Sequence, residues 1–199
     1  MKPGKLNYGE LLIPGKSKKE ILISTYFCHP SMANDSLSGT ILTAFLARHI
    51  ISLPNLKWSY RIVFIPETIG AISYLHINEK KMRDIDFGLN ITTVGGKGPF
   101  SYKKSFDESH FINRNIEETF KELNLKFKTY PFDIHGSDER QYSTQGPSIN
   151  VATIAKDKYY EYKEYHTSLD NLKLVNGKQI FQSLNVYSNL IHKLESREV

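Results

Sequence analysis

Four polar clusters along this sequence contain residue types that bind metal ions or move protons. They comprise His29 with Asp35, then Glu67, then Asp138, and finally His166. Zinc commonly takes imidazole nitrogen and carboxylate oxygen as ligands, and a catalytic zinc site keeps one position open for water. A further carboxylate beside that water can take its proton and pass it to a leaving amine. Two histidines and two aspartates could therefore hold an ion, with Glu67 as the proton carrier.

Each of these residues also has a purely structural explanation when it is taken alone. Asp35 could cap the helix that is expected to follow it, because Asp is favoured at that position. Glu67 could complement a helix dipole from the first turn, and Asp138 could belong to a turn after Gly136. A lone histidine after a strand is more often a surface or hydrogen-bonded residue than a ligand. Spacing alone therefore leaves a metal site as one interpretation, and the motifs must be weighed together.

The hydrophobic pattern predicts elements that would bring these clusters to one edge of a sheet. Apolar, β-rich runs at 20–27 and 58–66 predict buried strands. Apolar residues at helical spacing predict a helix over 39–52, and a shorter helix is expected over 69–80. Strand, helix, strand, helix is typical of a parallel sheet, whose binding crevice lies beyond the carboxyl ends of its strands. We therefore expect the polar clusters to meet at that edge.

The second half of the chain continues the same alternation. The expected elements there are strands at 86–94, 127–132 and 148–155 and helices at 111–124 and 178–194. The segment 127–132 is expected at a sheet edge, and 178–194 is expected to be the terminal helix. The whole chain, residues 1–199, is therefore predicted to form one α/β domain.

Composition excludes several classes of protein. The net charge of +5 comes from basic residues scattered among acids, so nucleic acid is not an expected partner. No apolar run approaches the roughly 20 residues that span a bilayer, and no secretory signal begins the chain. Cys28 is the single cysteine, so no intrachain disulfide is expected. We expect a cytoplasmic protein with a small-molecule or peptide substrate and no membrane partner; a homo-oligomer is left open.

Taken together, the four clusters resemble the motifs of the co-catalytic zinc aminopeptidases, peptidase clan MH, which also includes the glutaminyl cyclases. The motifs are HPSMANDSLSG at 29–39, PETIG at 66–70, SDERQY at 137–142 and YHTSLDN at 165–171. They stand in the order that the family has. The chain is most similar to the aminopeptidase-like proteins of bacterial polysaccharide-biosynthesis clusters, and four ordered motifs are far more specific than any one of them.

The resemblance implies a fold, an activity and a set of site residues. The fold would be a three-layer α/β architecture with a mostly parallel mixed sheet, and the activity would be zinc-dependent hydrolysis of peptide or N-acyl amide bonds. In the family, the residues that match His29, Asp35, Asp138 and His166 are metal ligands, and Asp35 would bridge two ions. Glu67 would be the general base.

The second motif departs from the family pattern. The family has a second glutamate there, a ligand of the second metal, and this sequence has Thr68. One zinc, held by about three of the four ligands, is therefore expected rather than two. The same departure leaves two alternatives open: a catalytically silent metal-binding or scaffold protein, and a single-zinc, cyclase-like acyltransferase.

Three further residues are candidates for supporting roles. His135 could orient a metal ligand or bind substrate, although a surface histidine without such a role is favoured. Thr68 could likewise lie next to a metal ligand or the substrate. Asp170 is expected to form local hydrogen bonds or to fix the orientation of the His166 ring without binding the metal itself. Cys28 ends an apolar run, so we expect a buried, inert thiol.

The resemblance covers about residues 8–194 and begins late relative to the family. We therefore expect an N-terminally shortened version, or a fragment of a larger architecture, with an exposed sheet edge.

Overall fold

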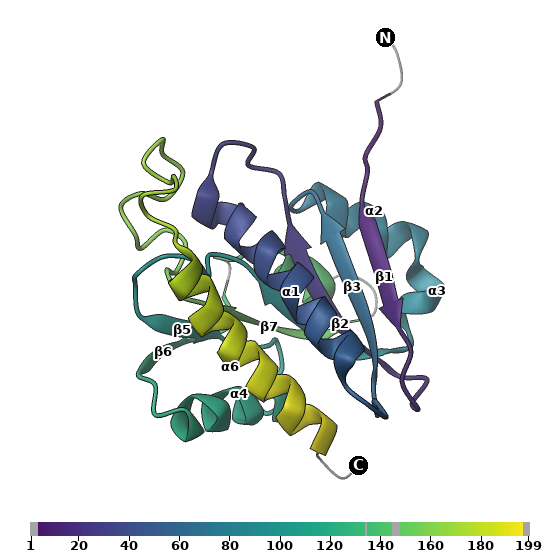
Figure 1. Cartoon of the computed structure of the whole chain (residues 1–199). Helices are drawn as coiled ribbons and strands as arrows, with labels where there is room; N and C mark the ends of the chain where they lie inside the picture. Colours follow the sequence, from purple (N-terminus) through teal and green to yellow (C-terminus); the bar gives the residue numbers. More distant parts are fainter. Residues whose placement is uncertain (1–3, 134, 145–147, 197–199) are drawn as a thin grey trace.

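A mixed β-sheet runs through the molecule and sets the position of every candidate site residue (Figure 1). The computed structural model describes residues 4–133, 135–144 and 148–196. Within them the sheet has seven strands in the order β1-β3-β2-β4-β7-β5-β6. These strands are β1 (Gly9–Ile13), β2 (Glu20–Tyr26), β3 (Ser59–Ile65), β4 (Ile85–Ile91), β5 (Phe100–Lys103), β6 (Phe127–Tyr130) and β7 (Asn150–Ala155).

The helices alternate with the strands along the chain. They are a short irregular helical turn, η1 (Ala33–Ser38), followed by α1 (Gly39–Ser52), α2 (Ile69–Ile77), α3 (Glu79–Met82), α4 (Phe111–Glu122), α5 (Asp138–Thr144) and α6 (Gly177–Ser196). In Figure 1, α1, α4 and α6 lie on one face of the sheet. Apolar residues of α2, α3 and α5 pack on the other face in a separate cluster. The result is the three-layer α/β fold with a mostly parallel mixed sheet that the sequence predicts.

The centre of the sheet is parallel and the flanks include antiparallel pairs. Strand β2 pairs in parallel with β3 and β4, and β4 pairs in parallel with β7. The pairs β1 with β3 and β5 with β7 are antiparallel, whereas β5 and β6 are parallel. Because the four central strands run in one direction, the loops that follow them leave from one edge.

Strand β2 shows why a central parallel strand lacks a regular alternation of apolar and polar residues. All seven of its residues are buried. Ile21 and Ile23 belong to the core that contains α1, α4 and α6, whereas Leu22 between them belongs to the core of the opposite face. A strand covered on both faces needs apolar side chains in both directions, so it lacks the alternation of a half-exposed strand.

The sequence expectations for the elements hold within a few residues, with four additions. The strands β1 and β5, the helical turn η1 and the helix α5 were not predicted from the sequence. Strand β5 is four residues long, and α5 has the sequence DERQYST, which carries no clear helical apolar stripe. The helix expected over 69–80 is divided into α2 and α3, separated by Asn78.

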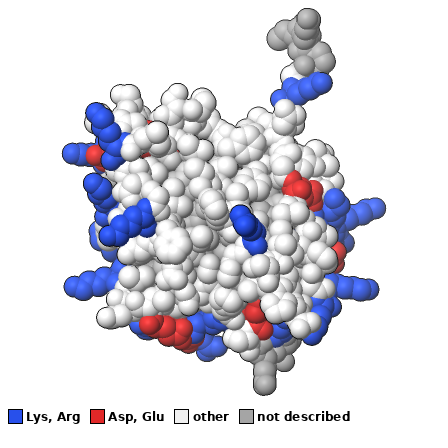
Figure 2. Space-filling view, in the orientation of Figure 1, with Lys and Arg blue, Asp and Glu red and all other residues white. Residues whose placement is uncertain are grey.

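Charged side chains are dispersed over the surface that Figure 2 shows. Lys and Arg stand singly or in small groups, mostly around the margin of this face, and broad uncharged areas lie between them. That view shows no continuous basic stripe of the kind that binds a nucleic-acid backbone. In the described part of the chain, none of the helices has the length and apolar character needed to cross a membrane.

Candidate metal centre

Loops that leave the carboxyl edge of the sheet bring three of the predicted ligands together. Donor atoms of His29, Asp35 and His166 all lie within 4.8 Å of one another. Nε2 of His166 is 3.1 Å from Oδ2 of Asp35, and the ring centroids of the two histidines are 5.0 Å apart. His29 follows β2, whereas His166 lies in the long connection between β7 and α6. Residues more than 130 positions apart in the chain therefore meet at one point.

The carboxylate of Asp35 is buried, and only one of its two oxygens accepts a hydrogen bond from the described residues. Its side chain is 1% exposed, and Oδ1 accepts a hydrogen bond of 2.8 Å from the hydroxyl of Tyr26. No described residue donates a hydrogen bond to Oδ2, which faces His166. Burial raises the pKa of Asp35. Asp35 does not cap α1, because Ser38 occupies the N-cap position and the only hydrogen bond that the described residues give the Asp35 carboxylate comes from Tyr26.

The backbone around Asp35 is held by a second aspartate from far along the chain. Asp170 is fully buried and accepts hydrogen bonds from the backbone N–H groups of Asn34, at 2.6 Å, and Asp35, at 3.0 Å. The hydroxyl of Tyr162 also donates to it at 3.3 Å. Asp170 therefore fixes the loop that carries Asp35, which is a longer-range role than the local hydrogen bonding expected from the sequence.

The ring of His166 is held from one side by an aromatic neighbour. Tyr165 stacks on it with 3.9 Å between ring centroids and an interplanar angle of 14°. The backbone of His166 has a φ of 54°, in the left-handed region that few residues other than glycine adopt. Such conformations cluster at functional sites, where the surrounding structure enforces them.

Glu67 lies beside this group at the end of β3. Its Oε2 is 3.9 Å from Nε2 of His29, and its Oε1 accepts a hydrogen bond of 2.6 Å from the hydroxyl of Ser137. A quarter of the Glu67 side chain is exposed, so solvent and substrate can reach it. Burial of the remainder raises the pKa of Glu67. A raised pKa suits a general base, because the best proton acceptors have a pKa near the working pH.

Asp138 lies next to the backbone of Thr68, outside the group formed by His29, Asp35 and His166. It is fully buried, and its Oδ1 accepts the backbone N–H of Thr68 at 2.7 Å. Its Oδ2 is buried without a hydrogen-bond partner among the described residues. Burial, reinforced by the charges of Glu67 and Glu139, raises the pKa of Asp138 well above its usual value. Its role as a metal ligand stays a prediction.

Thr68, which replaces the family's second glutamate, is held in an unusual conformation. Its φ of 59° is a strained value for a β-branched residue. The side chain is exposed, while the backbone N–H points inward to Asp138. The backbone of Thr68 therefore donates to a buried acid, and its side chain has no part in the group of His29, Asp35 and His166.

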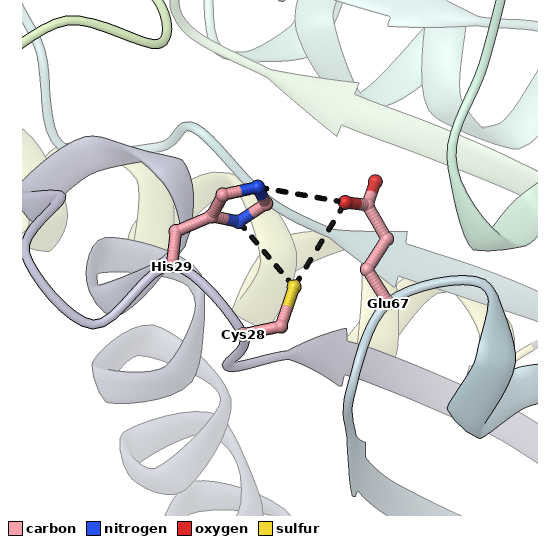
Figure 3. Close-up of side chains that lie close together, drawn as sticks. All are labelled: Cys28, His29 and Glu67. Atoms are coloured by element: carbon pink, nitrogen blue, oxygen red, sulfur yellow. Dashed lines mark hydrogen bonds and ion pairs between the residues drawn. The ribbon is translucent and has the colours of Figure 1, made fainter.

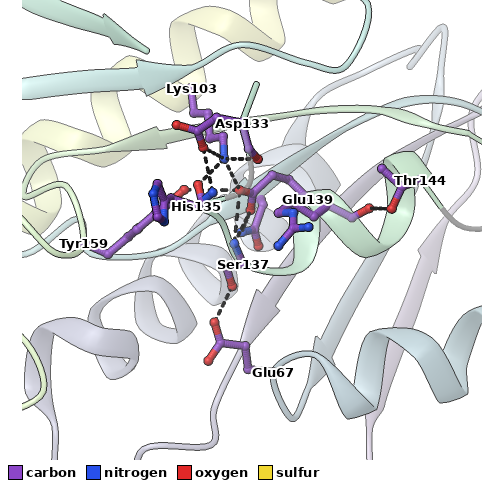
Figure 4. A network of polar contacts seen from close by, with 10 residues as sticks. Glu67, Lys103, Asp133, His135, Ser137, Glu139, Thr144 and Tyr159 are labelled. Atoms are coloured by element: carbon purple, nitrogen blue, oxygen red, sulfur yellow. Dashed lines mark hydrogen bonds and ion pairs between the residues drawn. The ribbon is translucent and has the colours of Figure 1, made fainter. Parts of the chain in front are cut away.

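A buried ion-pair network anchors the loop in front of α5 (Figure 4). The ammonium of Lys103 lies 2.9 Å from Oδ1 of Asp133 and 3.4 Å from Oε1 of Glu139. Glu139 also accepts the backbone N–H of Ser137 at 3.1 Å. Ser137 in turn donates its hydroxyl to Glu67, so the network leads from the buried Lys103 to the candidate base.

His135 lies at the surface near this network. The residue is exposed, and its ring is 6.1 Å from that of Tyr160. Its backbone carbonyl accepts a hydrogen bond from the ammonium of Lys103. His135 is therefore a surface histidine, as the sequence analysis favours. Its ring is not part of the group of His29, Asp35 and His166.

Cys28 differs from its sequence expectation, because its thiol is exposed rather than buried. Strand β2 ends at Tyr26, so Cys28 lies beyond the sheet and beside the site. Its Sγ is 3.4 Å from Nδ1 of His29 and 3.9 Å from Oε2 of Glu67 (Figure 3). Desolvation of the sulfur, with the charge of Glu67 nearby, raises the pKa of Cys28 to about 11. The thiol is therefore protonated at neutral pH.

The donor set and its electrostatics fit a divalent cation such as zinc. Three carboxyl groups gather here, and burial raises the pKa of each: Asp35, Glu67 and Asp138. Within the described chain their ion pairs are with histidines rather than with Lys or Arg. A bound cation would compensate this buried negative charge, and the free Oδ2 of Asp35 between two imidazoles is a suitable ligand.

Sequence reasoning missed three residues that support the site. They are Tyr26, which binds Asp35, Ser137, which binds Glu67, and Asp157, whose carboxylate accepts the backbone N–H of Gly98 at 2.8 Å and the side-chain amide of Asn34 at 3.1 Å. Asp157 follows β7 directly, so the rule that acids after parallel strands gather at the crevice would have identified it. Tyr26 carries no comparable signal, because its hydroxyl partner is set by the fold.

Comparison with protein families and curated proteins finds relatives of this chain. The family model described as a domain of unknown function (DUF4910) matches residues 1–197. A Clostridium acetobutylicum protein, described as a candidate polysaccharide biosynthesis protein with an aminopeptidase-like domain, is 38% identical over 196 residues. The match covers 98% of this chain and 45% of that protein, so the chain spans about half the length of the relative.

Solved structures of aminopeptidases and cyclases share the fold. A candidate peptidase from Clostridium acetobutylicum has a TM-score of 0.92 at 38% identity, covering 96% of this chain and 45% of that chain. A zinc aminopeptidase from Bacillus subtilis has a TM-score of 0.78 at 16% identity, covering 95% and 51%. A glutaminyl cyclase from Porphyromonas gingivalis has a TM-score of 0.77 at 14% identity, covering 95% and 77%. The resemblance stated from the motifs is thus confirmed at the level of fold.

Proposed function

The chain belongs to the family described as a domain of unknown function (DUF4910), and we propose that it is a zinc-dependent hydrolase of amide bonds, of the aminopeptidase type. One observation carries the proposal: donor atoms of His29, Asp35 and His166 lie within 4.8 Å of one another, with Glu67 3.9 Å from His29. The aminopeptidase fold of the neighbours supports it. We further propose that one zinc ion is held by these three ligands.

A bound zinc ion would polarise the substrate carbonyl and lower the pKa of water to about 7. The side chains of this chain handle the proton and the orientation of the reactants. Glu67 accepts the proton of the attacking water at its carboxylate and delivers it to the departing amine nitrogen. Ser137 donates to Oε1 of Glu67, which leaves Oε2, the oxygen that faces His29, for the proton.

The surroundings of Asp35 would prepare it for a cation. Tyr26 fixes Oδ1, Asp170 fixes the backbone, and Oδ2 is left without a hydrogen bond from the described residues. A carboxylate whose orientation is set in advance loses less entropy on binding an ion. The same arrangement points Oδ2 toward His166.

Metal content and a substrate panel test the proposal together. Protein purified without added metal is analysed for zinc, and turnover is measured on aminoacyl amides, N-acyl amino acids and N-acylated amino sugars. The amino sugars are included because a relative is described in terms of polysaccharide biosynthesis. We expect about one zinc per chain and turnover of at least one amide class. Protein that binds no zinc even when zinc is supplied would contradict the proposal.

A catalytically silent protein is the second candidate, and the exposed Thr68 at the position of the family's second glutamate favours it. Bound zinc with no turnover on any member of the panel would support that candidate. A peptide with N-terminal glutamine belongs in the panel as well, because glutaminyl cyclases share the fold. Ring-closed product from that peptide would indicate a cyclase-like acyl transfer instead of hydrolysis.

A further inference from the structure

Cys28, His29 and Glu67 form a second group of three donors beside the first. Their ligand atoms all lie within 4.8 Å of one another. Sγ of Cys28 is 3.4 Å from Nδ1 of His29 and 3.9 Å from Oε2 of Glu67. Figure 3 shows the three side chains pointing toward a common centre from the segments that follow β2 and β3. The family motifs assign no role to this cysteine.

The two separations from the sulfur are close to those of ligands around one tetrahedral ion. Bonds of about 2.3 Å to sulfur and about 2.0–2.2 Å to nitrogen or oxygen place neighbouring ligand atoms roughly 3.4–3.6 Å apart. The two measured separations from Sγ are within a few tenths of an ångström of that range. Cys28 is exposed and the side chains of His29 and Glu67 are 21% and 25% exposed, so an ion can enter from solvent.

We propose that Cys28, His29 and Glu67 form a binding site for a thiophilic divalent cation, distinct from the group that contains Asp35 and His166. The two groups differ in ligand softness. Thiolate selects soft ions, whereas carboxylate and imidazole without sulfur suit a borderline ion. Binding of such an ion displaces the proton of the Cys28 thiol, which passes to solvent. His29 belongs to both groups.

The second group has a consequence for the reaction, which rests on the proposed function. A cation held by Oε2 of Glu67 prevents that oxygen from accepting the proton of water. A thiophilic cation therefore blocks the proposed base. The proposed site is thus inhibitory.

Cadmium titration of the metal-free protein tests the site without any measurement of activity. Cys28 is the single cysteine in the sequence, so the ultraviolet charge-transfer band of a cadmium thiolate reports on this residue alone. We expect the band to saturate at one equivalent of cadmium. Glu67→Gln and His29→Ala should each weaken the apparent affinity by about tenfold or more, since changes in the surroundings of a metal cost 10–100-fold.

Two controls separate this site from a lone surface thiol and from the neighbouring group. Glu79→Gln alters an exposed carboxylate whose described ion pair is with Arg83, and it should leave the affinity unchanged. Asp35→Asn removes a ligand of the other group only, and it should also leave the band and its affinity intact. If Glu67→Gln and His29→Ala bind cadmium as the unaltered protein does, Cys28 acts alone and the proposal is overturned.

Two further outcomes also overturn it: no band at saturating cadmium, or a band that Asp35→Asn abolishes. The latter would make Cys28 an additional ligand of the first group. Because the band reports binding alone, it is unaffected if the amide hydrolysis proposed above is wrong. Conversely, a missing band would leave the hydrolase proposal standing.

Discussion

The two sides of the candidate site differ in how completely their side chains are prepared for an ion. On one side, Asp35 is buried, oriented by Tyr26 and placed 3.1 Å from His166. On the other side, Asp138 is buried with one oxygen unpartnered among the described residues, and the position next to Glu67 is the exposed Thr68. The comparison teaches that the fold can bring three donor side chains together on one side while the side next to it presents an exposed threonine.

The second side is anchored by a buried ion pair. Lys103 and Glu139 are buried, and together they hold the loop that presents Ser137 to Glu67. We interpret the first side as the place where an ion is held and the second side as the place where a proton is moved. The predictions that follow test this division.

The largest effect is expected from Glu67→Gln. The amide keeps the size of the side chain and removes the proton acceptor, so turnover on any substrate found in the panel should fall by about 10²–10⁴-fold, the usual contribution of general acid–base catalysis. Zinc content should be unchanged, because Glu67 lies outside the group of His29, Asp35 and His166. Turnover within tenfold of the unaltered protein would show that another group moves the proton.

The next largest effect is expected from Lys103→Met, which should lower the free energy of unfolding. The change leaves the carboxylate of Glu139, which is 0% exposed, without its buried cation. Breaking a buried pair in this way costs about 3–5 kcal/mol, which urea unfolding measures. Lys104→Met is the matched control, because Lys104 pairs with Glu108 nearer the surface and should cost less than about 1 kcal/mol. Equal losses in the two variants would contradict a special role for the network.

Asp35→Asn should separate the two sides most clearly. It removes the charged ligand while it keeps the shape of the side chain, and zinc affinity should fall by at least about 100-fold, beyond the usual effect of residues that only support a ligand. Asp86→Asn, at a partly exposed ion pair with Lys19, should have no effect on zinc. Titration with a competing chelator measures both. Unchanged affinity in the Asp35 variant would mean that the ion is held elsewhere.

The smallest of these effects is expected from Tyr26→Phe. It deletes the hydroxyl that donates to Oδ1 of Asp35 and that accepts from Thr92 at 2.8 Å. The carboxylate then loses its fixed orientation, and zinc affinity should fall by about tenfold. The same chelator titration measures this change. An effect as large as that of Asp35→Asn would indicate that the ring, and not only the hydroxyl, is needed to form the loop.

Much of the fold could be predicted because its signals are local. The buried runs of β2 and β3 and the apolar stripe of α1 lie in contiguous sequence, and each element lies within a few residues of its expected range. Strand β5 and helix α5 could not be predicted, because short polar segments take their conformation from neighbours. Lys103 of β5 illustrates this, since its partner Glu139 is 36 positions later and their pairing leaves no local pattern.

Part of the candidate site could be predicted because strand ends and motifs are visible in the sequence. They predicted His29, Glu67 and His166 as site residues, and the fold brings these side chains close together. The separation of Asp138 from the three-residue group could not be predicted, because a motif gives residue order and not the path of the loop between β6 and α5. The exposure of Cys28 depended on where β2 ends, and a shift of one or two residues there decides whether a side chain lies inside the sheet or at its edge.

A crystal structure of the protein with one equivalent of zinc, with anomalous data collected at the zinc edge, tests the division most directly. We expect one anomalous peak within about 2.0–2.2 Å of donor atoms from His29, Asp35 and His166, at the usual bond lengths of zinc to nitrogen and oxygen. Glu67 should lie beside that peak without binding it. Zinc found at other side chains, with no peak among these three, would contradict the account.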